Sequence, residues 1–192
     1  MKLEEPAVAF VTSSLRTIAI PSEDVQYFSV SGKFYAIVMP MYSVTVANCA
    51  GFNTMVLARE GRRVLEALIF MHSKDLVHMD VKGHNIFVDH AGNWFLGDFG
   101  SCTHTNNPVT SCSEMFYFEK VLNKPALPKY DFYMLMITLL IETLPRKHDF
   151  VSELKMKGSF MNEEIVEEKV RNIVAMGGDF GVLMGELLEL SR

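Results

Sequence analysis

One short segment of the sequence, HMDVKGHN (residues 78–85), brings together side chains that could take part in chemistry. Asp80 and Asn85 lie five positions apart, with Lys82 between them. Asp98 follows thirteen residues after Asn85, beyond two apolar runs, NIFVD and NWFLGD, that are joined by HAG. Such runs predict a β-hairpin. Because a hairpin reverses the chain, we expect Asp98 to return to the neighbourhood of Asn85.

The types of these four residues suit the transfer of a phosphoryl group. The Asn85 amide oxygen and the Asp98 carboxylate are hard ligands suited to Mg²⁺, an ion that uses few protein ligands together with phosphate oxygens. Asp80 could accept a proton from a hydroxyl, and Lys82 could neutralise charge on a phosphoryl group. Phosphoryl transfer needs this combination of positioning and electrostatic stabilisation. The simpler alternative makes Asp80 and Asn85 turn formers, which leaves Asp98, Lys82 and the hairpin unexplained.

The elements that must position this segment are mainly helical. Residues 52–72 have a helical pattern that leads directly into it. Its expected apolar face is Val64, Leu65, Leu68, Ile69 and Met71, opposite Arg59, Arg62, Arg63 and Glu66. Beyond Asp131 we expect three further helices: a Leu/Met-rich one that stops near Pro145, one capped by Asn162 that ends at Gly177–Gly178, and a last one through VLMGELLEL.

Upstream of the long helix the pattern favours strands. The runs VQYFSV and KFYAIVM flank Ser31–Gly32 and predict a first hairpin, which ends at Pro40 because proline cannot donate to a strand ladder. The polar segment 101–114 is predicted to be a long loop.

The composition of the whole chain narrows its class. With 192 residues, 49% hydrophobic and 21% charged, it is predicted to be one globular domain. The net charge of −5 and the lack of a basic block argue against nucleic acid as a partner. The longest apolar run, at 132–141, is too short to span a bilayer. The three cysteines, Cys49, Cys102 and Cys112, are expected to be reduced thiols of an intracellular, cytoplasmic or nuclear protein.

The catalytic segment resembles a known family. His78 to Asn85 is similar to the catalytic loop of protein kinases, and Asp98-Phe99-Gly100 to their metal-binding motif. A lysine two residues after the catalytic aspartate, here Lys82, resembles the serine/threonine branch of the family rather than the tyrosine branch. The resemblance implies an α+β, protein-kinase-like fold in one domain, 1–192. In it, residues 1–39 are the remnant of the N-terminal lobe, 40–43 the hinge and 44–192 a mostly helical lobe.

The resemblance also implies roles for individual residues. Asp80 and Lys82 would be catalytic, while Asn85 and Asp98 would hold Mg²⁺ on ATP. The run FYAIVMPMY looks like the last strand before the hinge, with Met39 as gatekeeper. The Pro40 carbonyl and the Tyr42 N–H would then bind the adenine edge, above Phe87 as an apolar floor. The implied partner is a protein substrate or a scaffold partner, and the oligomeric state is left open.

The sequence departs from the family pattern at several points. No Gly-rich loop and no Val-Ala-x-Lys strand precede residue 33. The family's Ala-Pro-Glu is replaced by YFE, whose Glu119 is expected to pair with Arg171 or Arg192. Met79 replaces the arginine that binds an activation-loop phosphate, so phosphorylation is expected to change activity little at Thr103, Thr105, Thr110, Ser111 or Ser113.

These departures keep three functions open. The first is an ATP- and Mg²⁺-dependent serine/threonine protein kinase. The second is a catalytically inactive pseudokinase or scaffold fragment. The third is a small-molecule phosphotransferase of the kinase-like superfamily. The intact Asp80, Asn85 and Asp98 favour an enzyme, because a scaffold has no physical need of an empty metal site.

Overall fold

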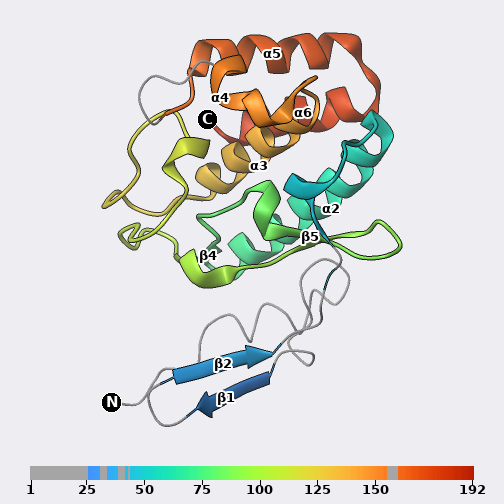
Figure 1. Cartoon of the computed structure of the whole chain (residues 1–192). Coiled ribbons are helices and arrows are strands. Elements are labelled where there is room, and N and C mark those ends of the chain that lie inside the picture. Colours follow the sequence, from blue (N-terminus) through green and yellow to red (C-terminus); the bar gives the residue numbers. More distant parts are fainter. Residues whose placement is uncertain (1–25, 31–33, 39–41, 43, 155–159) are drawn as a thin grey trace.

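The computed structural model describes residues 26–30, 34–38, 42, 44–154 and 160–192 (Figure 1). Short strands and longer helices make up these parts, so the predicted α+β class is confirmed. No helix among the described residues is both long and apolar enough to cross a membrane.

The first predicted hairpin is present. Strands β1 (Gln26–Val30) and β2 (Phe34–Val38) pair antiparallel, with Gln26 opposite Val38 and Val30 opposite Phe34. The predicted turn and the predicted nucleotide-binding residues Met39 and Pro40 lie outside the described residues.

The long helix that precedes the candidate site is α2 (Thr54–Ser73). The Asn53 side chain caps it by accepting a hydrogen bond of 2.9 Å from the Val56 N–H. Most of the predicted apolar face is buried, but Ile69 is 46% exposed and that assignment was wrong. The face that meets the core is centred on Gly61, Leu65 and Leu68, and Ile69 lies just beyond its edge.

A three-stranded sheet carries the second predicted hairpin. Strands β3 (Val44–Thr45), β5 (Ile86–Val88) and β6 (Trp94–Leu96) are antiparallel in the order β3-β5-β6, and Ile86 pairs with Leu96. A second pair joins β4 (Leu76–Val77), which ends at the candidate catalytic loop, to β7 (Thr103–His104). The segment predicted to be a loop therefore begins with a short strand.

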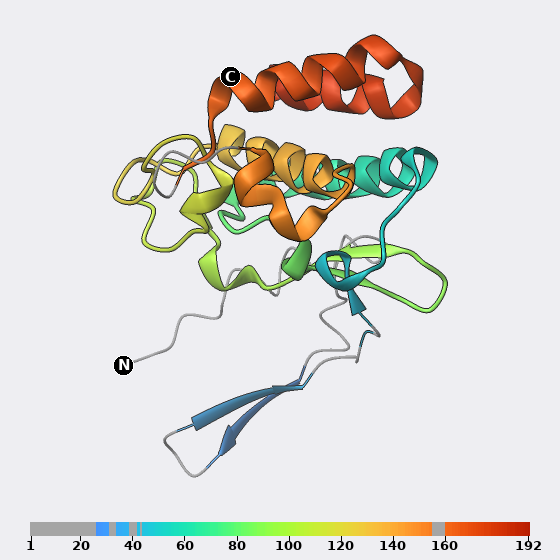
Figure 2. The same cartoon turned by 45° about the horizontal axis from the view of Figure 1, so that its top comes forward.

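The helical body packs in layers (Figure 2). It consists of α2, α3 (Pro128–Glu142), the short α4 (Phe150–Glu153), α5 (Glu163–Met176) and α6 (Gly178–Leu190). Single 3-10 turns lie between the strands and helices along the described chain: η2 (Val46–Asn48), η3 (Gly83–Asn85), η4 (Phe99–Ser101), η5 (Glu114–Phe116) and η6 (Lys147–Asp149). Helices α2, α3 and α6 meet at Gly61, where an added Cβ would lie 2.9 Å from Leu139 and Leu183 side-chain atoms. The almost wholly buried α3 is the centre of this core.

Candidate active site

The carboxylate of Asp80 is the centre of a compact polar cluster. Lys82 Nζ donates to both of its oxygens, at 3.0 and 2.8 Å, and the Ser113 hydroxyl donates to Oδ1. The Asn85 amide donates to the carboxylate and to the carbonyl oxygen of Asp80, both at 2.8 Å. Burial by itself would raise the pKa of Asp80, but these hydrogen bonds and the Lys82 charge outweigh it and hold the pKa below its usual value. Asp80 is therefore an ionised, firmly oriented acceptor.

A buried carboxylate on α3 fixes the backbone of this loop. Asp131 is fully buried and accepts hydrogen bonds of 2.7 Å from the His78 and Met79 N–H groups. His72 Nε2 lies 2.9 Å from its Oδ2. Met79 has a positive φ of 65°, a conformation that a non-glycine residue keeps only when its surroundings hold it. Asp131 thus supports the strained turn that presents Asp80.

The ring of His78 has a structural role. Its Nδ1 accepts from the Asp80 N–H at 3.3 Å, and its Nε2 lies 3.1 Å from the Gly97 carbonyl oxygen. The Asp80 N–H can only donate and the Gly97 carbonyl can only accept, so the ring is the neutral tautomer that carries its proton on Nε2. Burial lowers the pKa of His78, which agrees with this neutral form. The ring also packs beside Phe99, with centroids 5.2 Å apart.

The hairpin brings the two candidate metal ligands together in the chain path, as predicted. The Gly97 N–H donates to the Asn85 carbonyl oxygen at 2.9 Å, so Asp98 follows directly on the residue paired with Asn85. Asp98 is exposed and has a positive φ of 56°. Within the described parts of the chain, its carboxylate accepts only a long 3.4 Å hydrogen bond, from the Gly100 N–H. Its carboxylate is therefore open to a further ligand.

The side-chain oxygen atoms of Asn85 and Asp98 are suited to bind Mg²⁺ that also binds phosphate. Both amide hydrogen bonds of Asn85 go to Asp80, so its side-chain oxygen points to the other side of the amide group. Within the described residues, no group of three or more His, Cys, Asp or Glu side chains could hold a metal by itself. Asn85 and Asp98 thus offer one amide and one carboxylate oxygen, and Mg²⁺ would take its other ligands from phosphate and water.

The predicted adenine floor is part of an aromatic cluster. Phe87 and Phe95 are cross-strand partners on β5 and β6. The Tyr42 ring packs on both, with centroids 5.5 Å from Phe87 and 5.3 Å from Phe95. The structure thus places the rings of Tyr42 and Phe87 side by side.

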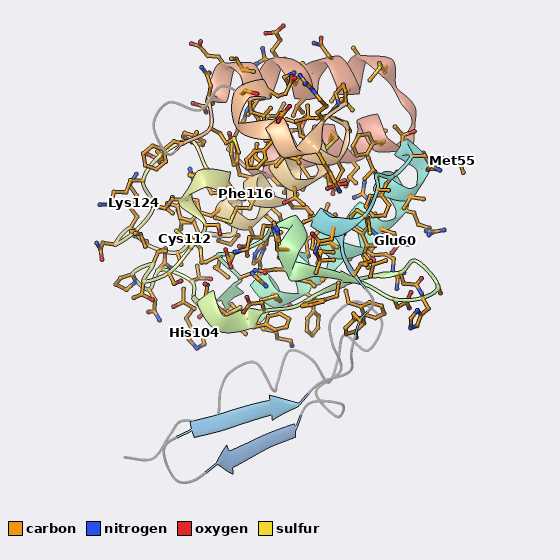
Figure 3. The ribbon with its side chains drawn as sticks, viewed as in Figure 1. Met55, Glu60, His104, Cys112, Phe116 and Lys124 are labelled. Atoms are coloured by element: carbon orange, nitrogen blue, oxygen red, sulfur yellow. The ribbon has the colours of Figure 1, made fainter. Side chains whose placement is uncertain are left out.

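Two contributors were missed by the sequence analysis. Ser113 lies 33 residues from Asp80, and no spacing rule connects them. Glu60 is fully buried, where it accepts hydrogen bonds from the Trp94 N–H at 3.0 Å and from Arg59 and Arg63 (Figure 3). A signal for Glu60 existed, because positions 60, 64 and 68 share one face of a helix. Glu60 thus links α2 by a hydrogen bond to strand β6, which leads to Asp98.

The segment between η4 and η5 is held in place largely by main-chain hydrogen bonds. The Asn106 N–H donates to the Ala126 carbonyl at 2.9 Å, and the Val109 N–H to the Lys124 carbonyl at 2.9 Å. Reciprocal bonds run from the Ala126 and Asn123 N–H groups. These backbone hydrogen bonds fix the path of the chain that leads to Ser113.

Other predictions about this region had mixed outcomes. The expected arginine partner of Glu119 is wrong: Glu119 pairs with Lys124 at 2.7 Å, while Arg171 and Arg192 both bind Glu167. The local geometry explains this, because Lys124 follows five residues after Glu119 in the same turn region. The three cysteines are free thiols, as predicted, and burial raises the pKa of Cys112 to about 11.

Comparison with known proteins finds similarity in sequence to protein kinases. The chain is 30% identical over 111 residues to the serine/threonine-protein kinase STE20 of Eremothecium gossypii. It is 48% identical over 46 residues to the eIF-2-alpha kinase GCN2 of Schizosaccharomyces pombe, and 52% over 40 residues to mitogen-activated protein kinase kinase kinase 3 of Mus musculus. These matches cover 55%, 24% and 21% of this chain, but only 11%, 3% and 6% of those proteins.

A solved structure and a family model cover more of the chain. The structure of the Cydia pomonella granulovirus kinase PK-1 matches 86% of this chain and 63% of its own, with a TM-score of 0.60 and 14% identity, which supports the fold alone. The family model described as the protein kinase domain matches residues 35–177. Since that match covers most of the chain and includes every residue of the Asp80 cluster, this chain belongs to the protein kinase domain family.

Proposed function

We propose that this chain catalyses ATP- and Mg²⁺-dependent phosphoryl transfer to a serine or threonine hydroxyl of a protein substrate. The observation that carries the proposal is the Asp80 cluster, in which Lys82, Ser113 and Asn85 hold one ionised carboxylate on a braced loop. The proposal treats the chain as one kinase-like domain, with residues 1–39 belonging to the small lobe, 40–43 to the hinge and 44–192 to the helical lobe.

Each residue has a distinct task in this proposal. Asp80 orients the substrate hydroxyl and accepts its proton as transfer proceeds. Lys82 neutralises charge on the transferring phosphoryl group. Asn85 and Asp98 would hold Mg²⁺, which would neutralise the phosphate oxygens of ATP. Phe87 would carry the adenine, together with the main chain at Pro40 and Tyr42 and with Met39 as gatekeeper.

A non-catalytic role, in which the domain binds a protein partner, is the second candidate. One observation favours it: the Tyr42 ring already packs against Phe87, the residue assigned to the base. If Tyr42 holds that position permanently, it competes with adenine for the aromatic surface. A nucleotide-binding measurement therefore separates the two candidates.

Thermal unfolding with and without millimolar Mg²⁺·ATP is the direct test. Ligand at 100 times its dissociation constant stabilises a protein by about 2.7 kcal/mol. For a chain of this size that is a rise in Tm of roughly 5–10 °C. We expect this rise in the unchanged chain, its loss in Asp98→Asn, and its retention in Asp179→Asn, which removes an exposed carboxylate on α6.

Transfer of labelled phosphate to generic protein acceptors completes the test. We expect transfer by the unchanged chain and none by Asp80→Asn, with Mg²⁺·ATP stabilisation retained in that variant. Stabilisation without transfer in the unchanged chain would favour the non-catalytic candidate. If neither occurs, the enzymatic proposal is wrong for this chain.

A further inference from the structure

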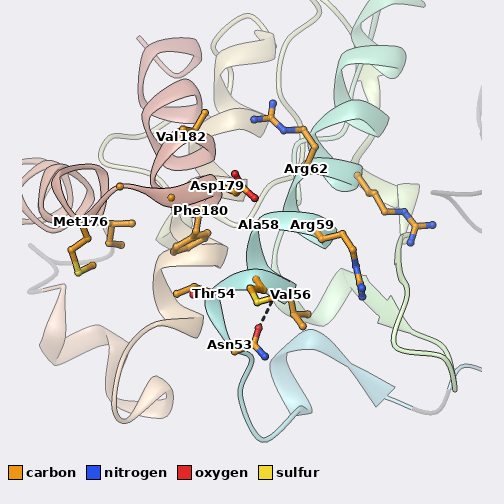
Figure 4. Close-up of a pocket in the computed structure, with 15 residues that line it drawn as sticks. Asn53, Thr54, Val56, Ala58, Arg59, Arg62, Met176, Asp179, Phe180 and Val182 are labelled. Atoms are coloured by element: carbon orange, nitrogen blue, oxygen red, sulfur yellow. Dashed lines mark hydrogen bonds between the residues drawn. The ribbon is translucent and has the colours of Figure 1, made fainter.

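Two of the cavities among the described residues differ in whether the catalytic loop lines them. The larger, of about 1050 Å³, is lined by the start of α2 and by residues around the α5–α6 junction, including Met55, Met176 and Val182 (Figure 4). No residue of the catalytic loop, 78–85, lines it. The smaller, of about 190 Å³, is lined by Gly83 and His84 of the catalytic loop.

The smaller cavity adjoins the catalytic loop, because Gly83 and His84 line it. Gly83 and His84 come immediately after Lys82. Phe116 forms another part of the lining, three residues beyond Ser113, whose hydroxyl binds Asp80. Small-molecule sites usually measure roughly 300–1,000 Å³. A cavity of this size beside the acceptor of a hydroxyl proton therefore has room for a single side chain of a peptide.

Apolar groups make up much of its lining. The Phe116 and Phe150 rings pack with centroids 5.9 Å apart. Ile141 of α3 also lines the cavity. The Thr138 hydroxyl donates to the Met134 carbonyl of its own helix at 2.8 Å, so its donor is already used.

The acidic group in the lining is already paired with a cation. Lys147 Nζ lies 3.3 Å from Glu142 Oε2, and it also donates to the carbonyl oxygens of Val46 and Cys49. Both side chains of this pair are largely buried, at 14% and 2% exposure. His84 carries no negative charge in any protonation state. A substrate arginine placed here would therefore lie beside the Lys147 ammonium without an unpaired carboxylate to balance it.

The position of Gly83 keeps this lining close to the catalytic loop. A Cβ added at Gly83 would lie 3.1 Å from the Ala47 backbone nitrogen. The loop and η2, which both line the cavity, are thus in close contact at this point.

We propose that this cavity binds an apolar side chain that lies near the phosphoacceptor serine or threonine in the substrate. The inference rests on the proposed function and specifies its substrate class: peptides with an apolar residue, rather than an arginine, at one position close to the acceptor. Burial of that side chain against Phe116, Phe150 and Ile141 supplies the preference.

Peptide binding tests the inference without requiring turnover. The probes are short fluorescent peptides with one central serine in an alanine–glycine background, with leucine or arginine placed in turn at each flanking position. Fluorescence anisotropy with the full chain gives each Kd. At one position we expect leucine to bind roughly tenfold more tightly than arginine, the difference produced by burying one aliphatic side chain.

A charge substitution in the cavity supplies the matched control. His84→Glu places a carboxylate in the lining and is expected to reduce or reverse the preference for leucine. His90→Glu adds the same charge at another exposed histidine, in the β5–β6 turn, and is expected to leave the preference unchanged. Arginine binding as tightly as leucine at every position of the unchanged chain would overturn the inference. Equal effects of the two substitutions would overturn it as well.

The failure of this inference is distinguishable from the failure of the proposed function. If Mg²⁺·ATP stabilises the chain and no peptide binds, the cavity assignment is wrong and the nucleotide site remains. If leucine peptides bind selectively and Mg²⁺·ATP has no effect, the cavity binds apolar side chains as inferred and the enzymatic proposal is wrong.

Discussion

Replacement of Asp131 by asparagine removes the acceptor on which the catalytic loop rests. The carboxylate now accepts from the His78 and Met79 N–H groups at 2.7 Å and contacts His72 Nε2 at 2.9 Å. An amide has one oxygen, so its NH₂ group must face at least one of the two backbone donors. That donor is left unpaired at a position with no solvent exposure.

The cost follows from these contacts. Hydrogen bonds to a charged acceptor contribute about 1.5–3 kcal/mol each, and an unsatisfied buried donor costs about 1–3 kcal/mol. We expect Asp131→Asn to lower the free energy of unfolding by about 3 kcal/mol, or Tm by roughly 6–12 °C. The loss is also expected to relax the positive φ of Met79, displace Asp80 and weaken any stabilisation by Mg²⁺·ATP.

Asp89 offers a control with the same number of hydrogen bonds. Its carboxylate accepts from the Ala91 N–H, the Asn93 N–H and the Asn93 amide, all at 2.9 Å. Because it lies in a solvent-accessible turn, water can replace a lost partner, and Asp89→Asn is expected to cost about 1 kcal/mol or less. Urea unfolding followed by circular dichroism measures both losses. Equal losses with unchanged m-values would refute the argument that burial makes Asp131 important.

Three further substitutions test separate parts of the site. Ser113→Ala removes a donor to Asp80, so the pKa of Asp80 should rise toward its usual value; an unchanged carboxyl titration in carbon-13 NMR would contradict this. The pKa of His78 is lowered in the folded protein, so as the pH falls below 6.5 the histidine is protonated in the unfolded chain before it is protonated in the folded one. The free energy of unfolding should therefore decrease there by up to about 1.4 kcal/mol per pH unit. Urea unfolding of His78→Phe between pH 5 and 6.5 should show a smaller slope, and an identical slope would exclude His78 as the cause. Glu60→Gln keeps the size of the side chain but removes the charge that binds Arg59 and Arg63, and should lower the free energy of unfolding by about 2 kcal/mol. An unchanged midpoint of urea unfolding would show that the charge is unimportant.

Much of the fold could be predicted because its signals are local. The cap at Asn162, the hairpin between Asn85 and Asp98, and the helix break at Gly177–Gly178 each depend on neighbouring residues. The approach of Asp98 to Asn85 could likewise be predicted, because the segment between them forms a hairpin that reverses the chain. These predictions agree with the structure because turn and cap chemistry acts over a few residues.

Contacts between distant residues could not be predicted in the same way. Ser113 reaches Asp80 only because the preceding segment pairs with residues 123–126. The choice of Lys124 over Arg171 as the partner of Glu119 depends on where α5 lies, and Arg171 is already paired with Glu167. Glu60 was not among the residues predicted from the sequence, since charged residues are mostly exposed in proteins.

The main-chain pairing of residues 106–109 with 123–126 has a consequence for how this region can vary over evolution. Backbone groups form these bonds, so most side chains there can be exchanged without changing the path of the chain. The prolines agree with this: Pro108 and Pro125 face each other in an isolated bridge, where neither has an N–H group to give. Proline at Asn106 or Val109 would remove a donor and is the replacement that selection should exclude. Related proteins could therefore keep the shape of this segment long after their sequences have diverged beyond recognition.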